Sequence, residues 1–226
     1  MEDFSFLNLE QDPNMKLVQE KIRVIAEELF EDYCIKCESG GEHKDRYFRF
    51  AELEFYYYKK GKFDSEWNKV TYPREKNAGE LFFHYSGMDI CFQSHFDKND
   101  SDKVFFGGML VRSVFELDEN DMIILHAGPL YVANLVLNSC KNTMPKLVKM
   151  SSHKVDLKQT LRYGTSKSAT ADEIANDLEL CFYINQYMGQ ELNWKLSSEH
   201  LGWDMQAEDF KFMKRNYKKQ RFGENG

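Results

Sequence analysis

The sequence predicts a mixed α+β domain, and three observations support this. Of its 226 residues 42% are hydrophobic and 15% aromatic, which is enough apolar surface to offset the entropy of ordering a core. Helical spacing of apolar residues over the first 32 positions then gives way to short aromatic and β-branched runs up to residue 114, and helix signals return after residue 128. We expect one domain over residues 1–226, with a core at 17–138 and a helical, basic extension at 139–226 packed on it.

The first expected helix begins after Asp12-Pro13, because Asp caps free amides and Pro suits the first helical position. Apolar side chains then recur at helical spacing to about Asp32: Val18, Ile22, Ile25, Ala26, Leu29 and Phe30. This pattern predicts a helix with one face on the core.

Two hairpins should follow. The sequence Ser39-Gly40-Gly41 separates strands at residues 33–37 and 46–58, and Ser86-Gly87 separates strands at 81–85 and 88–93. Further strands are expected at 108–116 and, after an acidic turn, at 122–125.

Three more helices are predicted. Gly128-Pro129 opens a buried helix over residues 130–137, with Pro near its first turn. A capping-box spacing at residues 170–173 leads into a helix that ends at Gly189, and residues 207–220 form a last one with a basic surface.

Composition excludes several classes of protein. Mean hydropathy is −0.62, and no apolar run approaches the roughly 20 residues needed to cross a bilayer. The amino end is acidic where a secretory signal would be basic, so we expect a cytoplasmic protein with no membrane partner. Five cysteines, an odd number, indicate reduced thiols; Cys34 and Cys37 could be a ligand or redox pair or simply two small strand residues, and no second pair completes a zinc site.

Charge is distributed unevenly along the chain. The net charge is −7, which by itself disfavours nucleic acid. The excess of acid lies within residues 1–110, with 15 basic against 22 acidic side chains, whereas residues 138–168 hold seven cations and one acid and residues 211–221 hold six cations and none. Two basic stretches could therefore contact phosphates.

Several short segments match one family in order. Residues 49–56, R-F-A-E-L-E-F-Y, resemble the R-I-V-E-T-E-A-Y segment of the alkyladenine (3-methyladenine) DNA glycosylases. Residues 71–74, T-Y-P-R, resemble their T-P-R-N, residues 79–91 resemble G-x-x-Y-V-Y-x-x-Y-G-M-x-x-C, and residues 109–113, M-L-V-R-S, resemble V-L-L-R-A. The Gly-Pro at 128–129 and the end of the first helix also match, so the resemblance covers about residues 17–135.

The resemblance implies a fold and an activity. The fold would be a curved antiparallel sheet with packed helices, related to the carboxy-terminal domain of methionyl-tRNA formyltransferase. The activity would be release of an alkylated or otherwise damaged purine from double-stranded DNA by a monofunctional N-glycosylase in base excision repair. No metal, other cofactor or obligate protein partner is implied.

The same resemblance assigns roles to individual residues. Such an enzyme flips the nucleotide out and activates a water at the sugar; Glu54 maps onto the carboxylate that does this, and Arg112 onto the arginine beside the water and phosphate. Tyr56 maps onto a ring that stacks on the base and Gln93 onto an amide that screens its edge. Each residue also has an ordinary alternative. Glu54 could be a solvated strand carboxylate and Arg112 part of a salt bridge. Tyr56 could pack in the core, and Gln93 could be a solvated amide.

The sequence also departs from the family. No His lies between residues 57 and 70, where the family has its pocket His; Trp67 could stack there, or be an ordinary buried Trp. One residue is missing between Gly79 and Gly87. If the loss is at the hairpin tip, which absorbs a deletion most easily, His84 faces the pocket, and if it is earlier Phe83 does.

The residue that wedges into the duplex would be Tyr85, or there is none, because Ser86 stands where the family has a Tyr. Two other classes of function stay open. One is a non-catalytic nucleic-acid or nucleobase-binding module on the same fold, and the other is a protein-interaction domain. A basic surface around Glu54 would favour the two nucleic-acid hypotheses.

Overall fold

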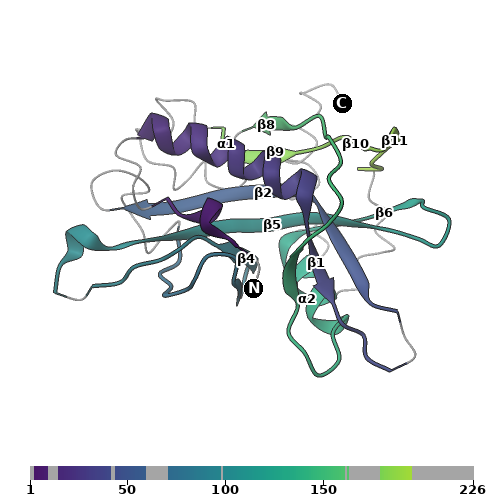
Figure 1. Cartoon of the computed structure of the whole chain (residues 1–226), viewed down its shortest axis with the longest axis horizontal. Coiled ribbons are helices and arrows are strands. Elements are labelled where there is room, and N and C mark those ends of the chain that lie inside the picture. Colours follow the sequence, from purple (N-terminus) through teal and green to yellow (C-terminus); the bar gives the residue numbers. More distant parts are fainter. Residues whose placement is uncertain are drawn as a thin grey trace, which may run out of the picture. The chain divides into compact units, whose positions relative to one another are not determined.

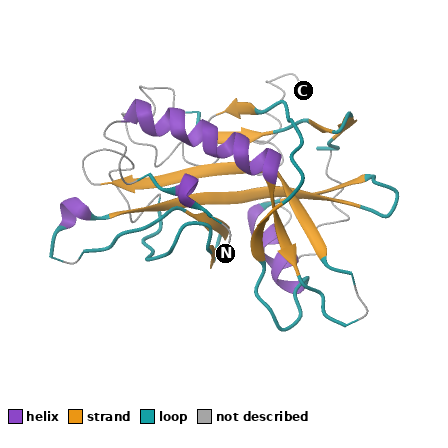
Figure 2. Cartoon of the chain, in the orientation of Figure 1, coloured by secondary structure: helices purple, strands orange, loops and turns teal. Residues whose placement is uncertain are grey.

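The computed structural model describes residues 3–9, 15–41, 44–59, 71–97, 99–160, 162 and 179–194. The chain divides into two compact units, Met1–Asn193 and Trp194–Gly226. Nearly all described residues belong to the first unit, which is a mixed α+β structure with a strongly curled, antiparallel sheet (Figures 1 and 2).

The main sheet is built from nine strands in the order β3-β4-β5-β2-β1-β7, with β6 on β5, β9 on β2 and β8 on β9. In chain order the strands are β1 (Tyr33–Cys37), β2 (Arg46–Lys59), β3 (Leu81–His84), β4 (Gly87–Cys91), β5 (Phe105–Leu117), β6 (Ile123–Ala127), β7 (Lys146–Lys149), β8 (Lys158–Thr160) and β9 (Cys181–Tyr183). A separate small hairpin joins β10 (Gln186–Tyr187) and β11 (Gln190–Glu191). The expected antiparallel sheet is therefore present; the finer likeness to a named fold stays a prediction.

Two α-helices occur among the described residues. Helix α1 (Met15–Asp32) packs against β1 and β2, and α2 (Pro129–Asn138) packs against β4 and β5. In Figure 1 α1 crosses above β2 while α2 lies below β5. Short 3-10 helices occur at η1 (Ser5–Leu7) and η2 (Ser101–Lys103).

Most elements up to residue 138 agree with the sequence patterns. The helical spacing gives α1, although its expected start at Asp12-Pro13 lies outside the described residues. Both predicted hairpins form, β1 with β2 and β3 with β4, and the buried helix after Gly128 forms as α2. Each of these elements is local in sequence, so periodicity and turn residues suffice to predict it.

The helix expected to end at Gly189 is wrong from Cys181 onward. Residues 181–183 instead form β9 on the edge of β2, and a tight hairpin follows in which Met188 and Gly189 have positive φ. β1 pairs with the first part of β2 and β9 with a later part, both on the edge away from β5. The apolar run Cys181-Phe-Tyr-Ile thus completes a sheet edge.

The described part of the expected helical extension contains short strands and irregular segments, and no helix. β7, β8 and β9 all lie beyond residue 138 and join the main sheet. The expected helix at 207–220 lies outside the described residues. None of the described helices is long and apolar enough to span a membrane.

Candidate functional site

Glu54 lies at the centre of the sheet. In β2 it is opposite Leu110 of β5 on one side and Cys181 of β9 on the other. Its side chain is 0% exposed, because strands on both edges and the packing above them exclude solvent. A strand with both neighbours in place holds a side chain in one direction, so the position of this carboxylate is set by the fold.

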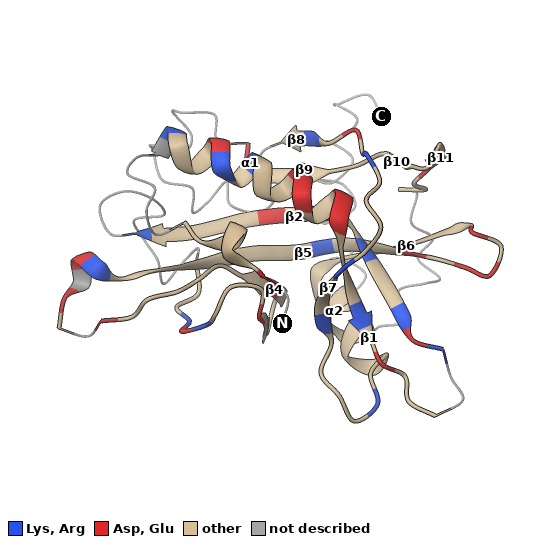
Figure 3. Ribbon diagram, in the orientation of Figure 1, with Lys and Arg blue, Asp and Glu red and all other residues tan. Residues whose placement is uncertain are grey.

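Glu54 is hydrogen-bonded to two of the predicted site residues. Its Oε2 accepts a bond from the Tyr56 hydroxyl at 3.0 Å and another from Arg112 Nη1 at 3.2 Å. Tyr56 is two residues along the same strand, where alternation puts it on the same face. Figure 3 shows the matching charges, with an acidic segment in the middle of β2 close to a basic segment of β5.

A second carboxylate lies beside this pair. Arg112 Nε is 3.7 Å from Oε1 of Glu52. Glu52 also accepts hydrogen bonds from Ser113 Oγ at 3.2 Å and Cys181 Sγ at 3.4 Å. The pairing of β2 with β5 is irregular around Glu52. Such a bulge changes the direction of side chains locally, so the carboxylates of Glu52 and Glu54 both lie beside the Arg112 guanidinium.

Arg162 completes the cluster. Its guanidinium carbon is 4.7 Å from the Tyr56 ring centre, and its Nη1 donates to the Phe55 carbonyl at 3.0 Å. Glu52, Glu54, Arg112 and Arg162 give two negative and two positive charges, which sum to zero. We call these four side chains with Tyr56 the central cluster.

The central cluster shifts the pKa values of two of its members. Burial raises the pKa of Tyr56 well above its ordinary value, and the charge of Glu54 raises it further. For Arg112 burial lowers the pKa, but the charges of Glu54 and Glu52 outweigh it and the net shift is upward. At neutral pH Tyr56 is therefore a neutral hydrogen-bond donor and Arg112 is a cation.

His84 lies on the same face of the sheet as Glu54. Three successive pairs connect the hairpin to β2: Phe82 with Asp89, Asp89 with Leu110, and Leu110 with Glu54. Directly opposed residues share a face and neighbours along a strand alternate, so His84 is on the Glu54 face and Phe83 on the opposite one. The position of His84 on the Glu54 face agrees with loss of the missing residue at the hairpin tip. Contact of His84 with a base stays a prediction.

The other predicted residues are less closely associated with Glu54. The Gln93 amide is engaged locally, with Oε1 accepting from the Ala78 amide at 3.4 Å and Nε2 donating to the Ser94 carbonyl at 3.2 Å. Tyr85 is 79% exposed at the hairpin tip, next to Ser86. Trp67 lies outside the described residues. Base screening by Gln93 and wedging by Tyr85 stay predictions.

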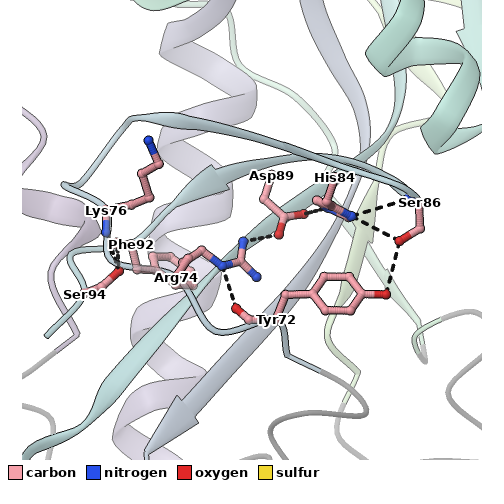
Figure 4. A network of polar contacts seen from close by, with 8 residues as sticks. All are labelled: Tyr72, Arg74, Lys76, His84, Ser86, Asp89, Phe92 and Ser94. Carbon is pink, nitrogen blue, oxygen red and sulfur yellow. Dashed lines mark hydrogen bonds and ion pairs between the residues drawn. The ribbon is translucent and has the colours of Figure 1, made fainter. Parts of the chain in front are cut away.

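A second polar cluster surrounds the β3–β4 hairpin (Figure 4). Asp89 forms an ion pair with Arg74 and lies 3.2 Å from His84 Nε2 through its Oδ1. On the other side of the imidazole, Nδ1 lies 3.1 Å from Ser86 Oγ. The Tyr72 hydroxyl is 3.4 Å from the same Oγ and hydrogen-bonds the Tyr85 hydroxyl. We call Tyr72, Arg74, His84, Tyr85, Ser86 and Asp89 the hairpin cluster.

The sequence patterns missed three members of the hairpin cluster. Tyr72, Arg74 and Asp89 fall inside matched motifs but received no role. The usable signal was the spacing His84-x-Ser86-x-x-Asp89 across a predicted hairpin tip, which puts His84 and Asp89 on neighbouring strands.

The cysteines give no sign of a metal or redox site. All five are free, and no group of three or more His, Cys, Asp or Glu within the described ranges is arranged to hold a metal ion. Cys37 Sγ donates to the Val136 carbonyl at 3.4 Å, and burial raises the pKa of its thiol. Burial likewise raises the pKa of Cys91 to about 12, so neither is a ready nucleophile.

The basic stretch at residues 138–168 is largely paired with acids where it is described. Lys146 lies 3.8 Å from Glu38, and Lys149 3.6 Å from Asp32; Lys154 and Lys158 also have acidic neighbours at 2.7 Å. Within its described part, Arg162 is the cation placed beside Tyr56. The stretch at 211–221 lies outside the described residues.

A cavity of about 470 Å³ opens near the start of β2, with Arg46, Arg49 and Glu116 among its lining residues. None of the predicted site residues lines it. Comparison with known proteins adds no assignment: no protein-family model matches this sequence, and no curated protein matches it.

Proposed function

We propose that this chain is a DNA N-glycosylase that releases an alkylated or otherwise damaged purine, with Glu54 as the group that activates water. The observation that carries the proposal is the pair of hydrogen bonds from Arg112 and Tyr56 to one oxygen of Glu54. The resemblance assigned roles to these three residues separately, and Arg112 is 58 positions away from Glu54.

The chemistry follows from the residue types. Loss of the base leaves positive charge on the sugar, which a nearby carboxylate offsets while it takes a proton from the attacking water. Arg112 is charged and planar, so it can position a phosphate or the water with more than one bond. Tyr56, a neutral ring beside the carboxylate, can stack on an extruded base.

The burial of Glu54 requires that the site open. With no exposed surface on the carboxylate, a flipped nucleotide must displace side chains that cover it. Base flipping already costs a few kcal/mol of unstacking, least for a damaged base, and opening the protein site adds to that cost.

The same burial supports a second candidate, a non-catalytic nucleic-acid or nucleobase-binding module. In that case the central cluster is structural, and binding uses the exposed aromatic hairpin around Tyr85. Base release separates the two candidates, since the module would bind damaged DNA and leave its bases in place.

The experiment measures purine release from alkylated duplex DNA by the full chain and by Glu54→Gln. The substitution keeps size and removes charge, so we expect a loss of about 10²-fold or more with little change in DNA affinity. Glu52→Gln is the matched control, because it removes a buried carboxylate from the same strand and the same arginine. Equal activity of Glu54→Gln and the unaltered chain would reject Glu54 as the catalytic group.

A further inference from the structure

The hairpin cluster contains a serine, a histidine and an aspartate in series. Ser86 Oγ is 3.1 Å from His84 Nδ1, and His84 Nε2 is 3.2 Å from Asp89 Oδ1. These distances are within the range expected for a nucleophile, its base and the group that orients the base. The series is distinct from the central cluster, which lies on β2 and β5.

The hydrogen bonds fix the roles of the two ring nitrogens. The backbone amide of Ser86 donates to His84 Nδ1 at 3.4 Å, so Nδ1 is an acceptor. The other nitrogen, Nε2, then carries the proton and donates a hydrogen bond to Asp89 Oδ1. In this tautomer Nδ1 faces the Ser86 hydroxyl with a lone pair, which is the arrangement required to remove its proton.

Asp89 is held as an anion behind the imidazole. Burial raises its pKa, but the hydrogen bond from His84 and the charge of Arg74 outweigh burial, and the net pKa is below the ordinary value. The Arg74 side chain is 1% exposed and Asp89 4%, so this ion pair is shielded from solvent. A buried anion stabilises the imidazolium that forms when the serine loses its proton.

The nucleophile itself is accessible. Ser86 is partly exposed at the turn and Tyr85 beside it is largely exposed, so the series runs from a buried acid to a surface hydroxyl. Figure 4 shows the Tyr72 hydroxyl pointing toward the same Ser86 oxygen. Tyr hydroxyls can donate to a developing oxyanion.

The N-terminal end of α2 also lies close to the turn. Pro129 is the first residue of that helix, and a Cβ built on Gly87 would be 3.0 Å from the Pro129 Cβ. The positive end of a helix dipole favours nearby negative charge, so it adds to the stabilisation that the Tyr hydroxyls offer.

We propose that Ser86, His84 and Asp89 form a nucleophilic relay that hydrolyses carboxylic esters at the hairpin tip. Ser86 Oγ bonds to the ester carbonyl carbon as its proton moves to His84 Nδ1, and the carbonyl electron pair moves onto oxygen. Collapse breaks the bond to the alcohol, which takes the proton from Nδ1. Water then attacks the acyl-serine with its proton passing to Nδ1, and Ser86 leaves and regains that proton, giving the acid.

Covalent labelling tests the relay directly. The full chain is incubated with a fluorophosphonate probe, and the adduct is located by peptide mass spectrometry. We expect labelling at Ser86, abolished in Ser86→Ala and slowed at least 100-fold in His84→Gln. Hydrolysis of p-nitrophenyl acetate should fall in parallel, and its pH dependence should be lost in His84→Gln.

The control is Ser94→Ala. Ser94 Oγ donates to the Phe92 carbonyl and accepts from the Lys76 amide, with no contact to His84 (Figure 4), so this variant should label normally. Absence of an adduct on Ser86, or equal labelling in His84→Gln, would show that the hydroxyl only stabilises the turn. Neither outcome depends on base release, so the glycosylase proposal and the relay succeed or fail separately.

Discussion

Replacing Arg112 by Met is the sharpest test of how the central cluster is held together. Met has a similar length and is apolar, so the change removes the charge and leaves most of the packing. The guanidinium now lies 3.2 Å from Glu54 and 3.7 Å from Glu52, and its side chain is 10% exposed. Without it the central cluster has two negative charges and one positive charge in a solvent-excluded space.

The expected loss follows from that burial. Removing one partner of a buried ion pair typically costs about 3–5 kcal/mol, because the remaining charge stays desolvated. The free energy of unfolding of most domains is only about 5–15 kcal/mol, so the loss should be plain in urea unfolding followed by circular dichroism. Arg112→Lys keeps the charge but loses the planar fork, and should cost less.

A second substitution shows whether the loss comes from the pair. In Glu54→Gln/Arg112→Met the two positive and two negative charges become one of each, so the double variant should be more stable than the sum of the single losses predicts. Coupling of about 0.5–3 kcal/mol is usual for residues in contact. A loss below about 1 kcal/mol in Arg112→Met, or no coupling, would refute the description of Arg112 and Glu54 as a buried pair.

Three other predictions concern regions beyond this pair. Burial raises the pKa of Glu116, but hydrogen bonds from His126 and Arg46 lower it to about 2 from 4.5, so its contribution is present above pH 4.5 and lost as pH falls toward 2. Glu116→Gln should therefore cost about 1–2 kcal/mol at pH 7, after solvent screening, and almost nothing at pH 2; an equal cost at both would contradict this. Gly107→Ala should cost more than about 2 kcal/mol, because its Cβ would lie 2.2 Å from a β2 carbonyl. Gly41→Asn should cost much less in the same urea unfolding assay, because no atom lies within 4 Å of a Cβ built on Gly41. For DNA binding, log affinity should fall with log salt at a slope of about −0.9 per phosphate contacted. This slope should become flatter when four cations are replaced by Gln: Lys214, Arg215, Lys218 and Lys219. An unchanged slope would mean that these four side chains do not contact phosphates.

Sequence patterns predicted the local elements because each is specified by its own residues. The helical spacing of Val18, Ile22 and Ile25 gives α1, and Gly-containing turns give the two hairpins. Strand alternation also put Glu52, Glu54 and Tyr56 on one side of β2, where all three reach the same cluster. Up to residue 138 such local patterns were sufficient, whereas the equally local hairpin of β10 and β11 was missed.

Features that depend on distant pairing were not predictable in this way. β9 joins β2 across more than 120 residues, and the short apolar run at 181–183 reads equally well as part of a helix. The ion pair between Arg74 and Asp89 could not be predicted either, because neither residue belongs to a sequence pattern that requires a charged partner. Nothing in either segment indicates the partner, so this ion pair could be found only in three dimensions, although the spacing of His84, Ser86 and Asp89 indicated the rest of the hairpin cluster.

The central cluster is not explained by stability alone. Burying two carboxylates and two guanidinium groups requires removing four charges from water, and a well-packed apolar set of similar volume is often at least as stable. The fold nevertheless places Glu54 in the middle of its longest strand, with β5 on one edge and β9 on the other. A charged set that an apolar set could replace at little cost in stability, yet whose carboxylate is held in one direction by two distant strands, is what a preorganised reaction site requires. Such preorganisation favours chemistry at Glu54 over a purely structural role, and base release by the Glu54→Gln and Glu52→Gln variants decides between them.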